Sequence, residues 1–148
     1  MSFQRIFAIA DTSPASASTA AGTTIRGLAA FDMFMIDAAL VGATGGTLDV
    51  YLQRNIAQIA DTAVWRDWLH FTQLASGAAA IKYSLSCGRN AVNTIVTVGE
   101  GTSVVLASGS FVGGHPGDSV RALYVAGAST SAGAAVAITI TGIRFPHQ

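Results

Sequence analysis

Apolar and polar residues alternate with a period of two along most of the chain from residue 31 onward. Side chains two positions apart lie on the same face of a β-strand, so this alternation predicts strands with one buried and one exposed face. It is clearest in the runs 33–40 and 48–53, whose apolar members on one face are Phe34, Ile36, Ala38, Leu40, Leu48, Val50 and Leu52. A glycine-rich turn at 42–46 separates the two runs, and this order predicts a β-hairpin.

Further runs of strand character follow at 64–73, 81–86, 92–98, 102–107, 119–126 and 134–145, with turn residues between them. The run 64–73 carries aromatic side chains on both faces, which predicts a core on one side and a second surface on the other. In the last run the apolar parity flips after Gly142, and a glycine at such a flip predicts a β-bulge. Residues 55–63 fit either one helical turn or a loop.

Some eight short strands separated by turns are typical of an all-β sandwich of antiparallel strands. A jelly roll places about eight strands in two sheets, and this is the topology that we favour, with Greek-key variants as the alternative. We expect residues 31–148 to form this β-sandwich (jelly-roll) domain. Residues 1–30 are expected to form an N-terminal strand and an extended arm.

The arm prediction depends on residues 11–24, DTSPASASTAAGTT, which contain no large apolar side chain and cannot form a core alone. We expect this stretch to be an extended arm or a linker whose deletion leaves the sandwich folded. Residues 1–10 are read as a first strand or part of the arm, because their apolar stretch is shorter than that of a secretion signal.

Only 11% of the residues are charged, and the formal net charge is zero. A quarter is usual, and interface centres are depleted of charge, so the composition favours a surface covered by neighbours in an assembly. The eight basic residues are scattered, which argues against a nucleic-acid partner and against an electrostatically held membrane protein. The chain lacks an apolar run long enough for a spanning helix, and we expect it to be made in the cytoplasm.

The residues that most often carry chemistry have no supporting pattern. Cys87 is the single cysteine and reads as a passive thiol at a strand end. The histidines, His70, His115 and His147, have no second ligand at a metal-binding spacing. Asp49 and Asp67 could face a common groove as paired acids, but nothing else marks them. We therefore predict no catalytic, cofactor-binding or metal-binding residue, and no enzymatic activity.

One binding alternative comes from the aromatic residues Tyr51, Trp65, Trp68 and Phe71. Exposed rings of this kind form platforms for sugars in β-sandwich carbohydrate-binding modules, whereas core packing would account for at least two of them. A carbohydrate-binding module is therefore kept as an alternative to a structural role.

Three stretches resemble small structural proteins of tailed bacteriophages. They are Gly46–Gln53 (GTLDVYLQ), Trp65–Leu74 (WRDWLHFTQL) and Asp118–Val125 (DSVRALYV), the last followed by a strand rich in Thr, Val and Ile. In that group a "TLDVYLQ" strand leads through a loop to a "W-x-D-x-x-H-F" strand. The loop here, 54–63, lacks the glycine-rich turn of that pattern.

The resemblance implies a virion protein, above all a capsid decoration (cement) protein on the surface of the major capsid lattice. Such proteins are often jelly-roll homotrimers at local threefold positions, so the expected partners are the major capsid protein and the chain itself. Many weak contacts would together resist the pressure of packaged DNA. The alternative within the virion is a tail, neck or head-fibre component.

Overall fold

The structure is a computed structural model that describes residues 3–15, 17–41, 45–55, 64–75, 81–88, 102–104, 106–130 and 133–146. Within these ranges the chain forms eight β-strands and one short 3-10 helix. They are β1 (Phe3–Thr12), β2 (Thr19–Arg26), η1 (Leu28–Ala30), β3 (Met33–Leu40), β4 (Leu48–Asn55), β5 (Trp65–His70), β6 (Ile81–Gly88), β7 (Ser119–Ala126) and β8 (Ala135–Arg144). The predicted all-β class is confirmed. The strand predicted at 92–98, and residues 56–63 of the ambiguous segment, lie outside the described residues.

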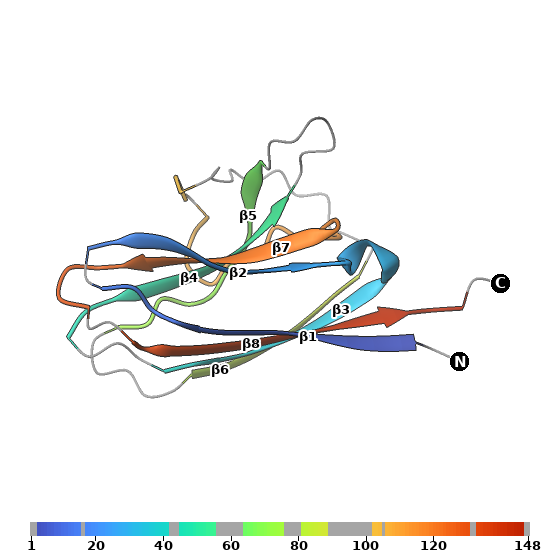
Figure 1. Cartoon of the computed structure of the whole chain (residues 1–148), viewed down its shortest axis with the longest axis horizontal. Coiled ribbons are helices and arrows are strands. Elements are labelled where there is room, and N and C mark those ends of the chain that lie inside the picture. Colours follow the sequence, from blue (N-terminus) through green and yellow to red (C-terminus); the bar gives the residue numbers. More distant parts are fainter. Residues whose placement is uncertain are drawn as a thin grey trace.

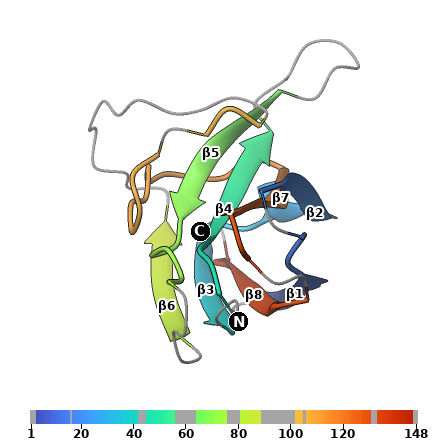
Figure 2. The ribbon, with the colours of Figure 1, turned by 90° about the vertical axis from the view of Figure 1, so that its left-hand side faces the viewer.

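The strands form two four-stranded antiparallel sheets that pack face to face (Figures 1 and 2). Sheet A has the order β1-β8-β3-β6, and sheet B has the order β2-β7-β4-β5. The pairs β1–β8, β2–β7, β3–β6 and β4–β5 are those of one long antiparallel hairpin. Rolling that hairpin up brings β8 beside β3 and β7 beside β4. This is the strand arrangement of a jelly roll, as predicted.

The core lies between the sheets and consists of the inward side chains of both. In β3 the alternation is regular: the side chains predicted to share a buried face are buried, and Met35, Asp37 and Ala39 between them are exposed. Phe7 and Ile9 of β1 join the same core. In β3 a period of two in the sequence therefore identifies the inward face correctly.

The connection from β3 to β4 crosses between the sheets, so the predicted hairpin is wrong. Alternation buries one face of a strand but does not select the sheet to which the strand belongs. A β-carbon on Gly46 would lie 2.5 Å from the backbone nitrogen of Thr130. The Thr130 hydroxyl also donates a hydrogen bond to the Thr47 carbonyl oxygen at 2.7 Å. The β3–β4 and β7–β8 crossings are thus fastened together at one end of the sandwich.

Residues 11–12 and 19–24 belong to strands β1 and β2 of the sandwich, which corrects the assignment of 11–24 to an arm. β1 pairs with β8 over its whole length and β2 pairs with β7, so both are edge strands. The Asp11 carboxylate joins them, because it accepts hydrogen bonds from the Thr23 N–H at 2.9 Å and from the Tyr124 hydroxyl at 2.7 Å. In β2 only Ile25 is buried, which explains why this strand has the composition of an unstructured segment.

Gly142 lies in an unbroken ladder, so the predicted bulge is wrong. Both ladders of β8 pass through it without a register shift, opposite Arg5 and Phe34. A β-carbon at this position would lie 2.6, 2.8 and 2.9 Å from ring carbons of Phe31. The glycine makes room for an aromatic ring on the core side of the strand.

The described residues of 102–107 are not part of any of the eight strands, so that prediction is also wrong. Leu106 instead packs with Tyr51 and Leu123, which point outward from β4 and β7. Farther along, Phe111 forms an isolated bridge with Leu69. We call residues 106–112 the covering loop, because Leu106 packs on the outer face of sheet B while residues 110–112 hydrogen-bond along the free edge of β5. Packing of such a loop produces strand-like alternation without a ladder.

Candidate functional site

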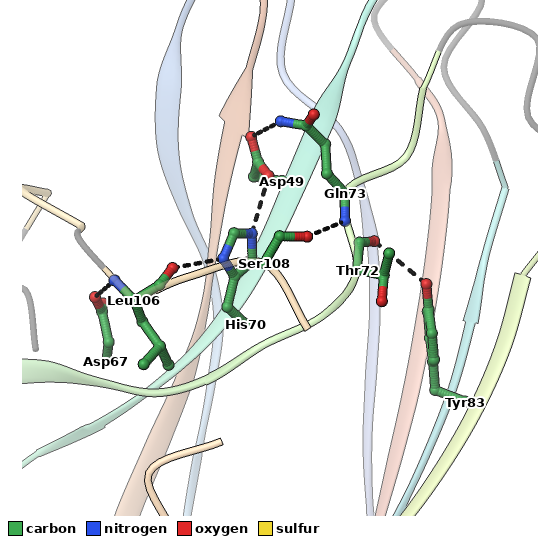
Figure 3. Close-up of polar contacts among 8 residues, drawn as sticks. All are labelled: Asp49, Asp67, His70, Thr72, Gln73, Tyr83, Leu106 and Ser108. Carbon is green, nitrogen blue, oxygen red and sulfur yellow. Dashed lines mark hydrogen bonds and ion pairs between the residues drawn. The ribbon is translucent and has the colours of Figure 1, made fainter. Parts of the chain in front are cut away.

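A polar network lies on the outer face of sheet B, beneath the covering loop (Figure 3). The ring of His70 bridges its two sides: Nε2 is 2.9 Å from Asp49 Oδ1, and Nδ1 is 2.7 Å from the Leu106 carbonyl oxygen. Gln73 donates from its side-chain amide to Asp49 Oδ2 at 2.7 Å. Its backbone N–H donates to the Ser108 hydroxyl oxygen at 2.9 Å. The network therefore ties the covering loop to β4 and to the end of β5.

Both ring nitrogens of His70 are engaged by hydrogen-bond acceptors, the Asp49 carboxylate and the Leu106 carbonyl oxygen. Neither nitrogen is therefore directed at the Ser108 hydroxyl, whose oxygen accepts from the Gln73 N–H. The residues of a Ser-His-Asp set are present, but they are not arranged as a catalytic triad.

The surroundings of Asp49 stabilise the ionised form of its carboxyl. Burial opposes the charged form of Asp49, but hydrogen bonds from His70 and Gln73 and the charge of His70 outweigh it and lower the pKa of this carboxyl. Tyr51 stacks on the His70 ring with centroids 3.9 Å apart. Burial, together with the charges of Asp49 and Asp67, raises the pKa of Tyr51 to about 12. Its hydroxyl is therefore neutral at physiological pH.

A second chain of contacts holds Asp67, which is fully buried. Its carboxylate accepts hydrogen bonds from the Gln53 amide at 3.0 Å and from the Leu106 N–H at 3.3 Å. Arg121 Nε donates to the Gln53 amide oxygen at 3.0 Å, and the guanidinium lies over the Trp65 ring. The paired carboxylates that we considered for acid catalysis are thus both engaged beneath one loop, and they do not face each other across a cleft.

The other candidate residues are also held by local structure. His115 Nε2 donates to the Phe31 carbonyl oxygen at 2.9 Å, and Nδ1 accepts from the Gly117 N–H at 2.9 Å, which fixes the turn before β7. Cys87 is buried, and burial raises the pKa of its thiol to about 11 despite a backbone hydrogen bond at Phe34. A thiol in that state is a poor nucleophile. His147 lies outside the described residues.

The aromatic platform suggested for sugar binding is not formed. Trp68 has no exposed surface, and Tyr51 and Phe71 are buried as well. A register shift between Leu52 and Gln53 makes Trp68 an extra residue opposite β4, and Trp68 and its neighbour Leu69 both enter the core. Alternation of residue types could not reveal this bulge, because both faces of β5 carry aromatic residues.

The described ranges contain no group of three His, Cys, Asp or Glu residues placed to hold a metal ion. They also contain no helix that is long and apolar enough to cross a membrane.

The outer face of sheet A contrasts with that of sheet B, because no named element of the described chain covers it. Its four strands align in rows, such as Ile6–Thr141–Met35–Ser86 and Ala8–Thr139–Asp37–Ser84. Alanine, serine and threonine dominate these outward positions, and the face is weakly charged. We call it the bare face.

Large apolar side chains gather toward one end of the bare face. Ile6 is 69% exposed, Met35 is 41% exposed, and Phe145, just beyond β8, is 50% exposed. Ile143 lies between Gln4 and Met33 in the adjoining row. Farther along the face, the small side chains leave a shallow hollow of about 360 Å³ whose lining includes Asp37, Lys82 and Tyr83. The sequence gives the outward parity of these residues but not the order of the strands that assembles them into one surface.

Comparison of the chain with protein-family models, with curated proteins and with solved structures gave no match in any of the three. The bare face is therefore the candidate functional site on structural grounds alone.

Proposed function

We propose that the chain is a structural protein of a bacteriophage virion, in first place a capsid decoration (cement) protein that stabilises the major capsid lattice. Its role is assembly: it contacts neighbouring subunits of the particle through the bare face, and its own chemistry is not required. A homotrimer at local threefold positions is the arrangement that the resemblance to tailed-phage proteins implies.

The observation that carries this proposal is the contrast between the two outer faces. The covering loop lies over part of sheet B, around Tyr51 and Leu123, and the Asp49–His70 pair and the Asp67 carboxylate hold it in place. No described element covers the four paired strands of sheet A, and Ile6, Met35 and Phe145 are exposed. A group of exposed large apolar side chains on a weakly charged surface is a feature of protein interaction sites.

The surroundings of this face favour a protein partner over a charged polymer. Among its outward positions, Asp37 and Lys82 are the only charged residues, and their charges cancel. Binding a nucleic acid or an anionic membrane would need a basic surface. Many modest contacts of this kind, repeated over a lattice, give strong attachment by multivalency.

The proposal is tested by quantitative mass spectrometry of purified particles that contain this protein. A decoration protein is expected at a copy number close to that of the major capsid protein. A few dozen copies would assign it to the tail, neck or head fibre and overturn the capsid role. Absence from purified particles would overturn the virion role altogether.

A matched pair of variants tests the surface. Met35→Glu places a charge among the exposed apolar residues of the bare face and is expected to lower incorporation into particles by about tenfold or more. Thr24→Glu adds the same charge at an exposed position of β2 in the other sheet and is expected to leave incorporation unchanged. Equal incorporation of the two variants would show that the bare face is not the contact.

A further inference from the structure

The bare face carries one acidic and one basic residue in a fixed relation. Asp37 of β3 pairs with Ser84 of β6, and Lys82 of β6 pairs with Ala39 of β3. Lys82 is therefore the diagonal neighbour of Asp37, one row farther along the adjacent strand, at a spacing of about 7–8 Å. Both side chains are exposed, and within the described part of the chain neither has a hydrogen-bond or ion-pair partner.

This arrangement is complementary to itself. A two-fold axis in the plane between two bare faces can place Asp37 of one copy opposite Lys82 of the other. The same rotation then places Lys82 of the first copy opposite Asp37 of the second, so one contact forms two ion pairs. Self-complementarity of this kind is the requirement of an isologous interface. We infer that the partner of the bare face is a second copy of this chain, packed face to face across a two-fold axis.

The remaining outward positions allow such packing. The neighbouring outward residues are small: Ala8, Ala39, Ala137 and Thr139. The shallow hollow beside Asp37 and Lys82 gives these two charged side chains room to reach the other copy. Stacked sheets lie about 10 Å apart, which small residues permit. Ile6 and Met35 add exposed apolar surface to the contact.

The size of the face sets the expected strength of association. Four strands of eight to ten residues span a flat area on the order of 600 Å². A standard stable interface buries about 800 Å² on each partner. We therefore expect reversible, concentration-dependent pairing and not a permanent dimer. If the chain also forms a homotrimer, the contacts within the trimer use surfaces other than the bare face. The two-fold contact between bare faces then joins two trimers.

This inference names the partner of the face used in the proposed function, and it rests on that choice of face. It is tested on the purified full chain without particles, so its failure is distinguishable from failure of the virion role. Light scattering after size-exclusion chromatography is measured for the wild type and two charge reversals, Asp37→Lys and Lys82→Glu. At high concentration the wild type is expected to have twice the mass of either variant. Each charge reversal is expected to weaken the self-association of the chain by about tenfold or more.

The decisive sample is an equal mixture of the two variants. One then carries two basic residues on the face and the other two acidic residues, so the mixture is expected to regain the doubled mass. Arg26→Glu, an exposed reversal on β2, serves as the control and is expected to pair like the wild type. The inference would be overturned if the wild type never exceeds the mass of the unpaired variants at any concentration. It would also be overturned if the variants pair as well as the wild type, or if the mixture of the two variants stays dissociated. Thermal melting of each variant checks that these exposed substitutions leave the fold intact.

Discussion

Replacement of Gly142 by alanine tests the packing of the sandwich at a single atom. The residue stands in a regular ladder of β8, and its backbone does not adopt the left-handed conformation that favours glycine. A methyl group there would come within 3 Å of three carbons of the Phe31 ring. That ring is itself confined, because it packs edge-on against Phe7 and Phe34 and stacks with Phe3.

Two opposing effects set the magnitude of the Gly142→Ala substitution. Overpacking a core by one methyl group costs about 1–3 kcal/mol. Replacing glycine by alanine in ordinary backbone recovers about 0.4–1 kcal/mol by restricting the unfolded chain. We therefore expect a net loss of about 1–2 kcal/mol in the free energy of unfolding. For a domain of this size, each kcal/mol corresponds to about 2–4 °C in Tm.

Urea unfolding of a double-mutant cycle measures this effect. Phe31→Leu removes the ring carbons that the new methyl group meets, so Gly142→Ala should cost clearly less in the Phe31→Leu background than in the wild type. Gly133→Ala is the comparison, because nothing lies near its β-carbon and any cost there comes from its positive φ. A neutral or stabilising Gly142→Ala, or an equal cost in both backgrounds, would refute the steric reasoning.

Three further predictions concern other parts of the sandwich. Trp68→Ala should lower the free energy of unfolding by about 3–5 kcal/mol, measured by denaturant titration, because the ring is fully buried. The pKa of Asp49 is lowered in the folded state, so its contribution to stability is present above its ordinary pKa and lost as the pH falls through the folded value. Between about pH 6 and about pH 3 the wild type should therefore lose more stability than Asp49→Asn. Deletion of residues 11–24 removes most of β2, so, contrary to the expectation from composition, circular dichroism should show an unfolded chain.

Much of the fold could be predicted from the sequence, because alternation reports which side of a strand is buried. The run 119–126 coincides with β7, and 134–145 contains β8. The failures arise where another contact replaces the ordinary one. The hairpin prediction failed because Gly45 and Gly46, which are typical turn residues, lie in a connection that crosses between the two sheets. The prediction of a bulge at Gly142 was wrong, because the glycine is needed to make room for the Phe31 ring, which comes from a distant part of the sequence.

The candidate surface could be predicted only in part. Outward parity of Met35, Asp37 and Lys82 follows from local alternation, but their proximity depends on β6 pairing with β3. The network on sheet B was missed for a related reason. Its anchor, Leu106, lies 36 residues from His70, and a loop that binds side chains leaves no periodic signal. His70 and the carboxylates are far apart along the chain, so the sequence gives no sign that the fold places them in one network.

Oxidation of Met35 tests most directly whether the bare face is buried on assembly. The side chain is 41% exposed in the single chain, so hydroxyl radicals should oxidise it readily in the dilute Lys82→Glu protein. In purified particles that contain the wild-type chain, mass spectrometry should show oxidation of Met35 slowed by about tenfold or more if contact desolvates this face. Equal oxidation rates in the particle and in the dilute variant would show that the face stays open, and would contradict its role as the assembly surface.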